Sequence, residues 1–139
     1  MELEPALVHA NRSEFRGLAG IEAEDTAVRE YAVHAISTLA VTGEVDIVTD
    51  GKRLVRVANG HPLMDRVTAM GCAAIAIAAA CRAVEPDPIL AAVAALVATG
   101  VAGEIAAGSA RGPGSFAVEI VDALYGLDAE ILQERAKIR

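Results

Sequence analysis

The sequence is short of aromatic residues, cysteine and positive charge. It has no tryptophan, two phenylalanines and two tyrosines among 139 residues, whereas thirty residues are alanine. This composition indicates closely packed helices rather than a core of large rings. Twelve basic against nineteen acidic side chains give a net charge of −7. That balance argues against a protein that binds nucleic acid through the phosphate backbone.

The few cysteines and histidines form no pattern of a structural metal site. Cys72 and Cys81 lie nine positions apart in one predicted helix, so they face opposite sides of it and cannot pair with each other. The three histidines, His9, His34 and His61, are widely scattered and give no zinc spacing. The first residues carry two glutamates where a secretory signal needs basic and then apolar residues. We therefore expect a cytoplasmic protein.

The length and the apolar content predict one folded domain over residues 1–139. Apolar residues make up 54% of the chain, which is enough for a buried core. Two uncharged stretches, 69–81 and 88–103, are shorter than the roughly 20 residues that cross a bilayer, and charged residues separate them. We expect them to be buried helices, with no membrane as partner.

The hydrophobic periodicity and the turn residues predict a mixed α/β chain. Asn11 and Ser13 are candidate caps for the first helix and Ser115 for a later one. Asp50-Gly51 predicts a two-residue hairpin turn. The expected strands are 5–10, 38–41, 45–49 and 52–57, and the expected helices are 12–18, 25–37, 70–84, 89–107, 115–125 and 129–137.

Such a chain has few strands for its many helices. Two of the helices, 70–84 and 89–107, are apolar nearly all round and need cover on more than one side. We therefore expect either a partner chain or further strands to complete the layers.

Two glycine-containing segments are candidate sites. Thr42-Gly43 follows a buried strand, where a glycine lets the backbone turn sharply or approach a ligand. Gly71-Cys72 opens a helix, where backbone N–H groups can bind an anion. His61 and the glycine-rich segment 111–115 are better explained as a structural loop and a helix cap, so no ligand is assigned to them.

Four groups of motifs in one order resemble the hydroxyethylthiazole kinase family. They are VTGEVD at 41–46 with VTDG at 48–51, NGHPLM at 59–64, RVTAMGC at 66–72, and GEIA at 103–106 with GPGSF at 112–116. The resemblance implies part of a ribokinase-like layered α/β sandwich, the helix-rich C-terminal half with a β-hairpin. Family members have about twice this length, so residues 1–139 would correspond to their C-terminal half.

The resemblance also implies a reaction and its cofactors. The family uses ATP and Mg²⁺ to phosphorylate the alcohol of 5-(2-hydroxyethyl)-4-methylthiazole in thiamine biosynthesis, and it forms trimers with sites between subunits. A homo-oligomer is therefore expected here. The alternative is a non-catalytic remnant that keeps the fold and an oligomer or nucleotide interface.

The helix start 69–72 would hold the reacting groups. By resemblance, Ala69, Met70 and Gly71 contact the substrate, and Cys72 takes the place of the aspartate base of the wider ribokinase group. From the residues alone, a small buried residue at a helix start is the favoured interpretation of Cys72, and the resemblance reverses this preference. The family usually has glycine where Ala69 stands, and a positive φ there would strain alanine by about 1 kcal/mol or more.

The remaining assignments concern the nucleotide and the metal. Thr42 matches a nucleotide-binding position, although a plain strand end explains it equally well. His9 stands where the family has an arginine that contacts ATP, and a histidine cannot offer the bidentate fork of arginine to phosphate. Glu14 matches a metal-binding glutamate, with a solvated surface residue as the alternative. The weakened contacts at His9 and Ala69 predict slow turnover.

Overall fold

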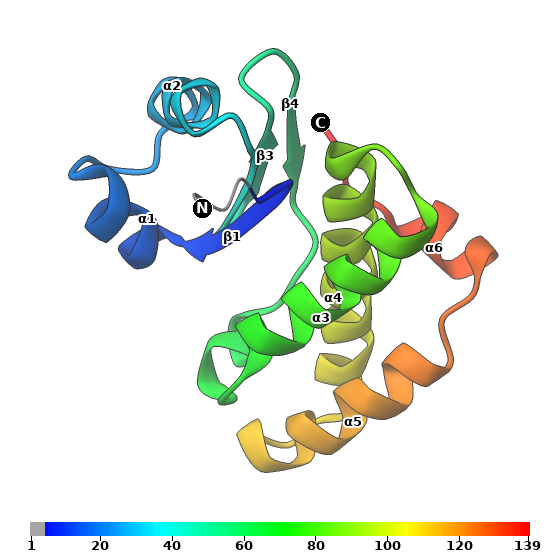
Figure 1. The fold of residues 1–139 in the computed structure, drawn as a ribbon. Coiled ribbons are helices and arrows are strands. Elements are labelled where there is room, and N and C mark those ends of the chain that lie inside the picture. The colour runs from blue at the N-terminus through cyan, green and yellow to red at the C-terminus, as the bar shows by residue number, and fades with distance from the viewer. Residues whose placement is uncertain (1–4) are drawn as a thin grey trace.

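The computed structural model describes residues 5–139, which form a four-stranded sheet between two layers of helices (Figure 1). The N-terminal residues 1–4, on which the expectation about a secretory signal partly rests, lie outside the described residues. The strands lie in the order β1 (Leu7–Asn11), β2 (Thr38–Thr42), β3 (Asp46–Thr49) and β4 (Leu54–Val57). β1 and β2 are parallel, and the other pairs are antiparallel.

Two helices connect the parallel strands and cover one face of the sheet. They are α1 (Arg12–Ala19) and α2 (Asp25–Ala35). Asn11 caps α1, as its sequence position predicts, because its side-chain oxygen accepts the Glu14 N–H. Phe15 and Val28 pack there against Leu39 and Val41 of β2. Alternate residues of β2 therefore face this helical layer.

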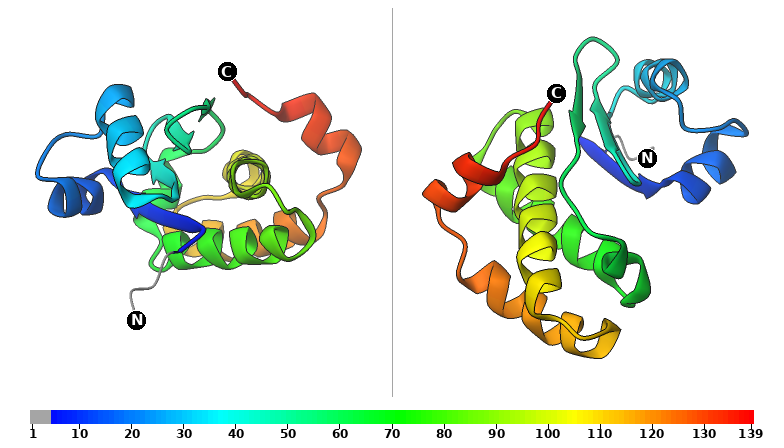
Figure 2. Two further views of the ribbon diagram at one scale, coloured as in Figure 1. Left: turned by 45° about the horizontal axis from the view of Figure 1, so that its top comes forward. Right: turned by 180° about the vertical axis from the view of Figure 1, so that it is seen from behind.

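The other face of the sheet packs against α4 (Pro88–Ser109). Ala40, Val48 and Val57 of the sheet form one core cluster with Ile89 and other residues of this helix. Around α4 lie α3 (Met70–Val84), α5 (Pro113–Tyr125) and α6 (Ala129–Arg135). The chain then returns to the sheet, where Ile138 bridges to Val57 of β4 (Figure 2).

The α4 helix is the central element of the second core. Among the described residues it is the one helix long and apolar enough to cross a membrane, with 22 residues, but 72% of its most apolar window is buried in the protein. The expectation of a buried helix is therefore confirmed, although the helix is longer than the uncharged stretch 88–103. The expectation that one copy of the chain leaves the apolar faces of its helices without packing partners is wrong for α4. It holds for α3, whose buried residues are Ala74 and Ala78.

The structure corrects two local predictions and adds one element. Thr49 pairs with Leu54, so the hairpin loop has four residues rather than two, and Asp50 accepts the N–H of Arg53. α5 begins at Pro113 with Gly112 as its cap, because proline suits the first helical position. Ser115 therefore lies inside the first turn. A short 3₁₀ helix, η1 (Pro62–Arg66), occupies the predicted loop after β4.

Candidate functional site

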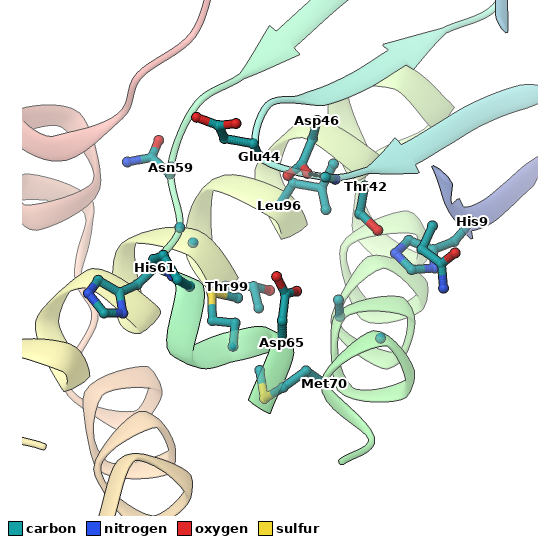
Figure 3. A pocket seen from close by; sticks show the side chains of 18 residues that line it. His9, Thr42, Glu44, Asp46, Asn59, His61, Asp65, Met70, Leu96 and Thr99 are labelled. Atoms are coloured by element: carbon teal, nitrogen blue, oxygen red, sulfur yellow. Dashed lines mark hydrogen bonds between the residues drawn. The ribbon is translucent and has the colours of Figure 1, made fainter. Parts of the chain in front are cut away.

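A cavity of about 480 Å³ opens where the ends of β1 and β2 meet the start of α3 (Figure 3). Asn11 and Thr42 are register partners at these two strand ends. Ligands of open α/β sheets commonly bind beyond the carboxyl ends of parallel strands. Of the residues assigned by resemblance, His9, Thr42, Met70 and Gly71 line this cavity. The fold thus brings together residues that lie more than sixty positions apart in the chain.

The turn after β2 is fixed by its own side chains. The Asp46 carboxylate accepts the Gly43 N–H over 3.0 Å. A β-carbon at Gly43 would collide with the Arg12 side chain, so a larger residue would have to displace the guanidinium from this turn. Arg12 in turn donates to the Ala23 carbonyl over 2.7 Å. Thr42 is therefore held at the cavity by a turn that cannot easily move.

Asp46 is a buried carboxyl group at the cavity that the local sequence patterns do not single out. Only 7% of its surface is exposed. Burial raises the pKa of Asp46 to about 6, against the opposing effects of the Gly43 N–H and the Arg12 charge. Its position could have indicated a role, because Asp46 is the last residue of the motif VTGEVD at 41–46, four residues after Thr42.

The start of α3 has the geometry of an anion site. Ala69 caps the helix with φ 69° and ψ 12°, in the left-handed region, and its side chain makes no capping hydrogen bond. The first N–H groups of the helix therefore have no side-chain acceptor from the cap, and the helix dipole favours negative charge there. The positive φ confirms that alanine is strained at this position. Met70 and Gly71 present this turn to the cavity.

Cys72 lies beside the cavity rather than in its wall. Its side chain is exposed and not disulfide-bonded, so the alternative of a small buried residue is wrong. Cys81, on the same helix, is also a free thiol and is half-buried. The role of Cys72 as a proton acceptor stays a prediction.

His9 presents a half-buried, neutral ring to the same turn. Its Nε2 atom is buried and has no hydrogen-bond partner among the described residues. Burial lowers the pKa of His9, and the negative charge of Glu14 opposes this shift. The imidazole is therefore uncharged at neutral pH and offers at most one hydrogen bond at Nε2.

Glu14 does not line the cavity. Its carboxylate accepts the Asn11 N–H over 2.8 Å and completes a capping box at the start of α1. The described residues contain no group of three His, Cys, Asp or Glu side chains arranged to hold a metal ion. The carboxylates that do line the cavity belong to Glu44, Asp46 and Asp65, which are not among the residues assigned by resemblance.

The segment 59–65 forms the remaining wall and rests on α4. A β-carbon at Gly100 would lie 2.7 Å from the Asn59 side chain, and one at Gly103 would lie 2.5 Å from the Met64 sulfur. Both glycines of α4 therefore allow this wall to approach the helix closely. His61 accepts the Leu63 N–H at Nδ1 and caps η1, which supports its structural interpretation.

Comparison with known proteins identifies the kind of protein that this fold and cavity belong to. The fold and the cavity define an α/β protein with a pocket of polar and apolar residues at the ends of its parallel strands. The model of the hydroxyethylthiazole kinase family matches residues 2–130. The chain belongs to this family.

The individual matches agree with this assignment. The chain is 47% identical to a hydroxyethylthiazole kinase of Granulibacter bethesdensis over 150 residues, which cover 99% of this chain and 55% of the relative. It is 39% identical to one of Zea mays, covering 99% of this chain and 56% of the relative. The chain spans about half the length of the curated relatives it matches.

Solved structures support the same fold. A hydroxyethylthiazole kinase of Pyrococcus horikoshii superposes with a TM-score of 0.89 at 37% identity, over 96% of this chain and 54% of that one. A protein of Streptococcus mutans superposes with a TM-score of 0.72 at 17% identity, which supports the fold alone. The predicted α/β fold is confirmed.

Proposed function

We propose that this chain, corresponding to the C-terminal half of its relatives, forms part of a site that transfers phosphate from ATP to the alcohol of 5-(2-hydroxyethyl)-4-methylthiazole. The observation that carries the proposal is the cavity in which Thr42, His9 and the start of α3 meet. Phosphoryl transfer needs positioned donors for phosphate charge and a group that receives the alcohol proton. The family membership supports the identity of the two substrates.

The phosphate groups of ATP would bind at the first turn of α3. The N–H groups of Met70 and Gly71 would donate to phosphate oxygens, and the Thr42 hydroxyl would bind the nucleotide from the end of β2. His9 would add a neutral hydrogen bond in place of a charged one. Ala69 would contact the thiazole through its backbone, and Cys72 would accept the proton of the alcohol.

The cavity also has an apolar part that suits a methylthiazole ring. Met64, Met70, Ala74 and Leu96 line it, next to the polar Thr99. Ligand pockets commonly combine such apolar walls with a few placed polar groups. We place the ring there, with its alcohol directed toward the start of α3.

The donor types at the cavity are compatible with Mg²⁺ that arrives bound to ATP. Mg²⁺ needs only one or two carboxylates when phosphate oxygens and water complete its coordination. Glu44 and Asp46 are the carboxylates that accompany Thr42 on the cavity lining. Glu14, the metal residue by resemblance, lies outside the lining and would need a longer reach. When bound, the ion would neutralise phosphate charge in the transfer.

Kinetic measurement tests the proposal directly. ADP release is followed with Mg-ATP in the presence and absence of the thiazole alcohol. We expect release that depends on the alcohol and is slower than about 1 per second, the lower range for kinases. The proposal would be contradicted if ADP release did not depend on the alcohol and the chain bound neither ATP nor the thiazole alcohol.

The second candidate is a non-catalytic family member. The strained Ala69 and the neutral His9 favour it, because both weaken the phosphate contacts on which transfer depends. Nucleotide binding without alcohol-dependent ADP release would favour this candidate. In both cases we expect a homo-oligomer, since α3 leaves apolar residues exposed, among them Val84 at 86%. A cytoplasmic location is expected from the family membership.

A further inference from the structure

The carboxylate of Glu104 joins three parts of the chain at the outer wall of the cavity. Its Oε1 atom accepts the Gly60 N–H over 3.1 Å, the Asn59 side-chain amide over 3.2 Å and the Lys137 ammonium over 2.9 Å. Burial alone would raise the pKa of Glu104, but these donors outweigh it and hold the pKa below its usual range. Glu104 is therefore ionised at neutral pH, and its Oε1 atom accepts from all three donors.

The Asn59 amide is saturated by the same arrangement. Its oxygen accepts the Lys137 N–H over 2.7 Å, and its nitrogen also donates to the Arg135 carbonyl over 2.9 Å. Only 6% of Asn59 is exposed, so each of these hydrogen bonds satisfies a buried polar atom. The C-terminal segment continues along β4, where Arg139 and Arg56 exchange two backbone hydrogen bonds.

This network holds one particular wall of the cavity. Asn59 and Gly60 begin the segment 59–65, which carries Met64 and Asp65 to the lining. Figure 3 shows Asn59 and His61 across the cavity from His9 and Thr42. Segment 59–65 contributes Met64 to the apolar part of the cavity, beside Met70, Ala74 and Leu96 of α3 and α4. It contributes none of the groups proposed to bind phosphate, which lie on β1, β2 and the start of α3.

We propose that Glu104 and Lys137 are positioning residues that fix segment 59–65 and thereby set the affinity for the thiazole alcohol, not for the nucleotide. Their action is indirect, through Asn59 and Gly60. The C-terminal residues thus help to determine specificity from outside the cavity. The choice of ligand rests on the proposed function, whereas the positioning of the wall does not.

Two ligand titrations and one exchange measurement test this inference. The variants are Glu104→Met, Glu104→Gln and Lys137→Met. The control is Ile105→Ala, which removes a side chain packed on the core from the next position of the same helix. Dissociation constants are measured for 5-(2-hydroxyethyl)-4-methylthiazole and for ADP, and hydrogen exchange is measured at the Gly60 amide in the free protein.

We expect Glu104→Met to weaken binding of the thiazole alcohol roughly tenfold and to speed exchange at Gly60 by at least as much, because three donors lose their acceptor. ADP affinity should change less than about twofold. Glu104→Gln, which keeps an acceptor oxygen, and Lys137→Met should show smaller changes in the same direction. Ile105→Ala should lower the melting temperature without accelerating exchange at Gly60 relative to other amides.

Two results would overturn the inference. One is that Glu104→Met weakens the binding of the thiazole alcohol and of ADP equally, in proportion to the loss of folding stability, as in the Ile105→Ala control. The other is unchanged exchange at Gly60. If the unaltered chain binds no thiazole alcohol, the proposed function fails, and exchange at Gly60 still decides whether Glu104 positions the wall.

Discussion

The imidazole of His9 lies against the first turn of α3, with its Cε1 atom 3.7 Å from the place where a β-carbon on Gly71 would stand. This contact joins the middle of β1 to the proposed phosphate site. Because Nε2 of the same ring is buried and unpartnered within the described part of the chain, it is available to extend that site. The charge of residue 9 should therefore govern phosphate affinity.

Replacing His9 with arginine should strengthen nucleotide binding. A charge-assisted hydrogen bond to phosphate contributes about 1.5–3 kcal/mol, so we expect the affinity for ADP to rise roughly tenfold or more. Calorimetric titration measures this change. His34→Arg, which adds the same charge on the exposed surface of α2, is the matched control and should leave the affinity nearly unchanged. An equal gain in both variants would show that only net charge matters.

Replacing Ala69 with glycine should stabilise the fold. Alanine at φ 69° is in a region that L-residues occupy at a cost, and glycine is also the better helix cap. We expect the free energy of unfolding to rise by about 1 kcal/mol, as measured by chemical denaturation.

Ile36→Gly provides the comparison for Ala69→Gly. Ile36 is the other non-glycine residue with positive φ among those described, at 52°, and its side chain is 77% exposed. It should gain similar stability without any change in ADP affinity, because it does not line the site. Lower stability of both variants would show that the left-handed conformation is not strained.

Asp46 should make stability depend on pH. Its pKa is 3.8 when unperturbed and about 6 in the folded chain, so the folded state binds more protons between these values. Its contribution is therefore favourable at low pH and is lost as the pH rises to about 6. Asp46→Asn should match the unaltered chain near pH 4 and be more stable by about 3 kcal/mol above pH 7. Denaturation curves across this range measure the difference, and a constant difference would contradict the assignment.

The chain should self-associate. α3 buries little of its apolar surface, and exposed side chains also occur on α5, where Val118 and Val121 are 63% and 62% exposed. Light scattering would measure the mass of the particles at tens of micromolar chain. At this concentration even modest interfaces associate. Val84→Lys on α3 should shift the equilibrium toward monomer. A monomer that unfolds cooperatively would show that one copy covers its own core.

The elements and the turn at the start of α3 could be predicted from the sequence because their signals are local. The bounds of α3 agree with the predicted helix 70–84, and Asn11 caps α1 as predicted. The resemblance selected His9, Thr42 and Gly71, which do line one cavity. Glu14 was harder to place, because a capping glutamate and a metal-binding glutamate look alike in a sequence.

The roles of Asp46 and Glu104 could not be predicted from local patterns. Asp46 matters because three-dimensional packing buries its carboxyl group beside the Gly43 N–H. Glu104 meets Lys137 only after the chain has returned from α6 to β4. Both residues stand in the motifs that identify the family, but a motif alone does not show which partners its residues acquire. The expected two-residue hairpin turn is wrong because the Asp50 carboxylate accepts the N–H groups of Lys52 and Arg53 and thereby stabilises a wider loop.

The double variant His9→Arg with Ala69→Gly should accelerate phosphate transfer to the thiazole alcohol. The arginine would restore a charged contact to phosphate, and the glycine would relax the turn whose N–H groups stabilise the transferring group. Each contact of this kind changes a rate by roughly one to two orders of magnitude, so ADP release should rise at least tenfold. The same double variant carrying Cys72→Ala should lose this gain while it retains ADP affinity, because Cys72 would act on the alcohol proton alone. Full turnover without Cys72 would remove the thiol from the reaction, and unchanged turnover of the double variant would show that neither substitution limits transfer.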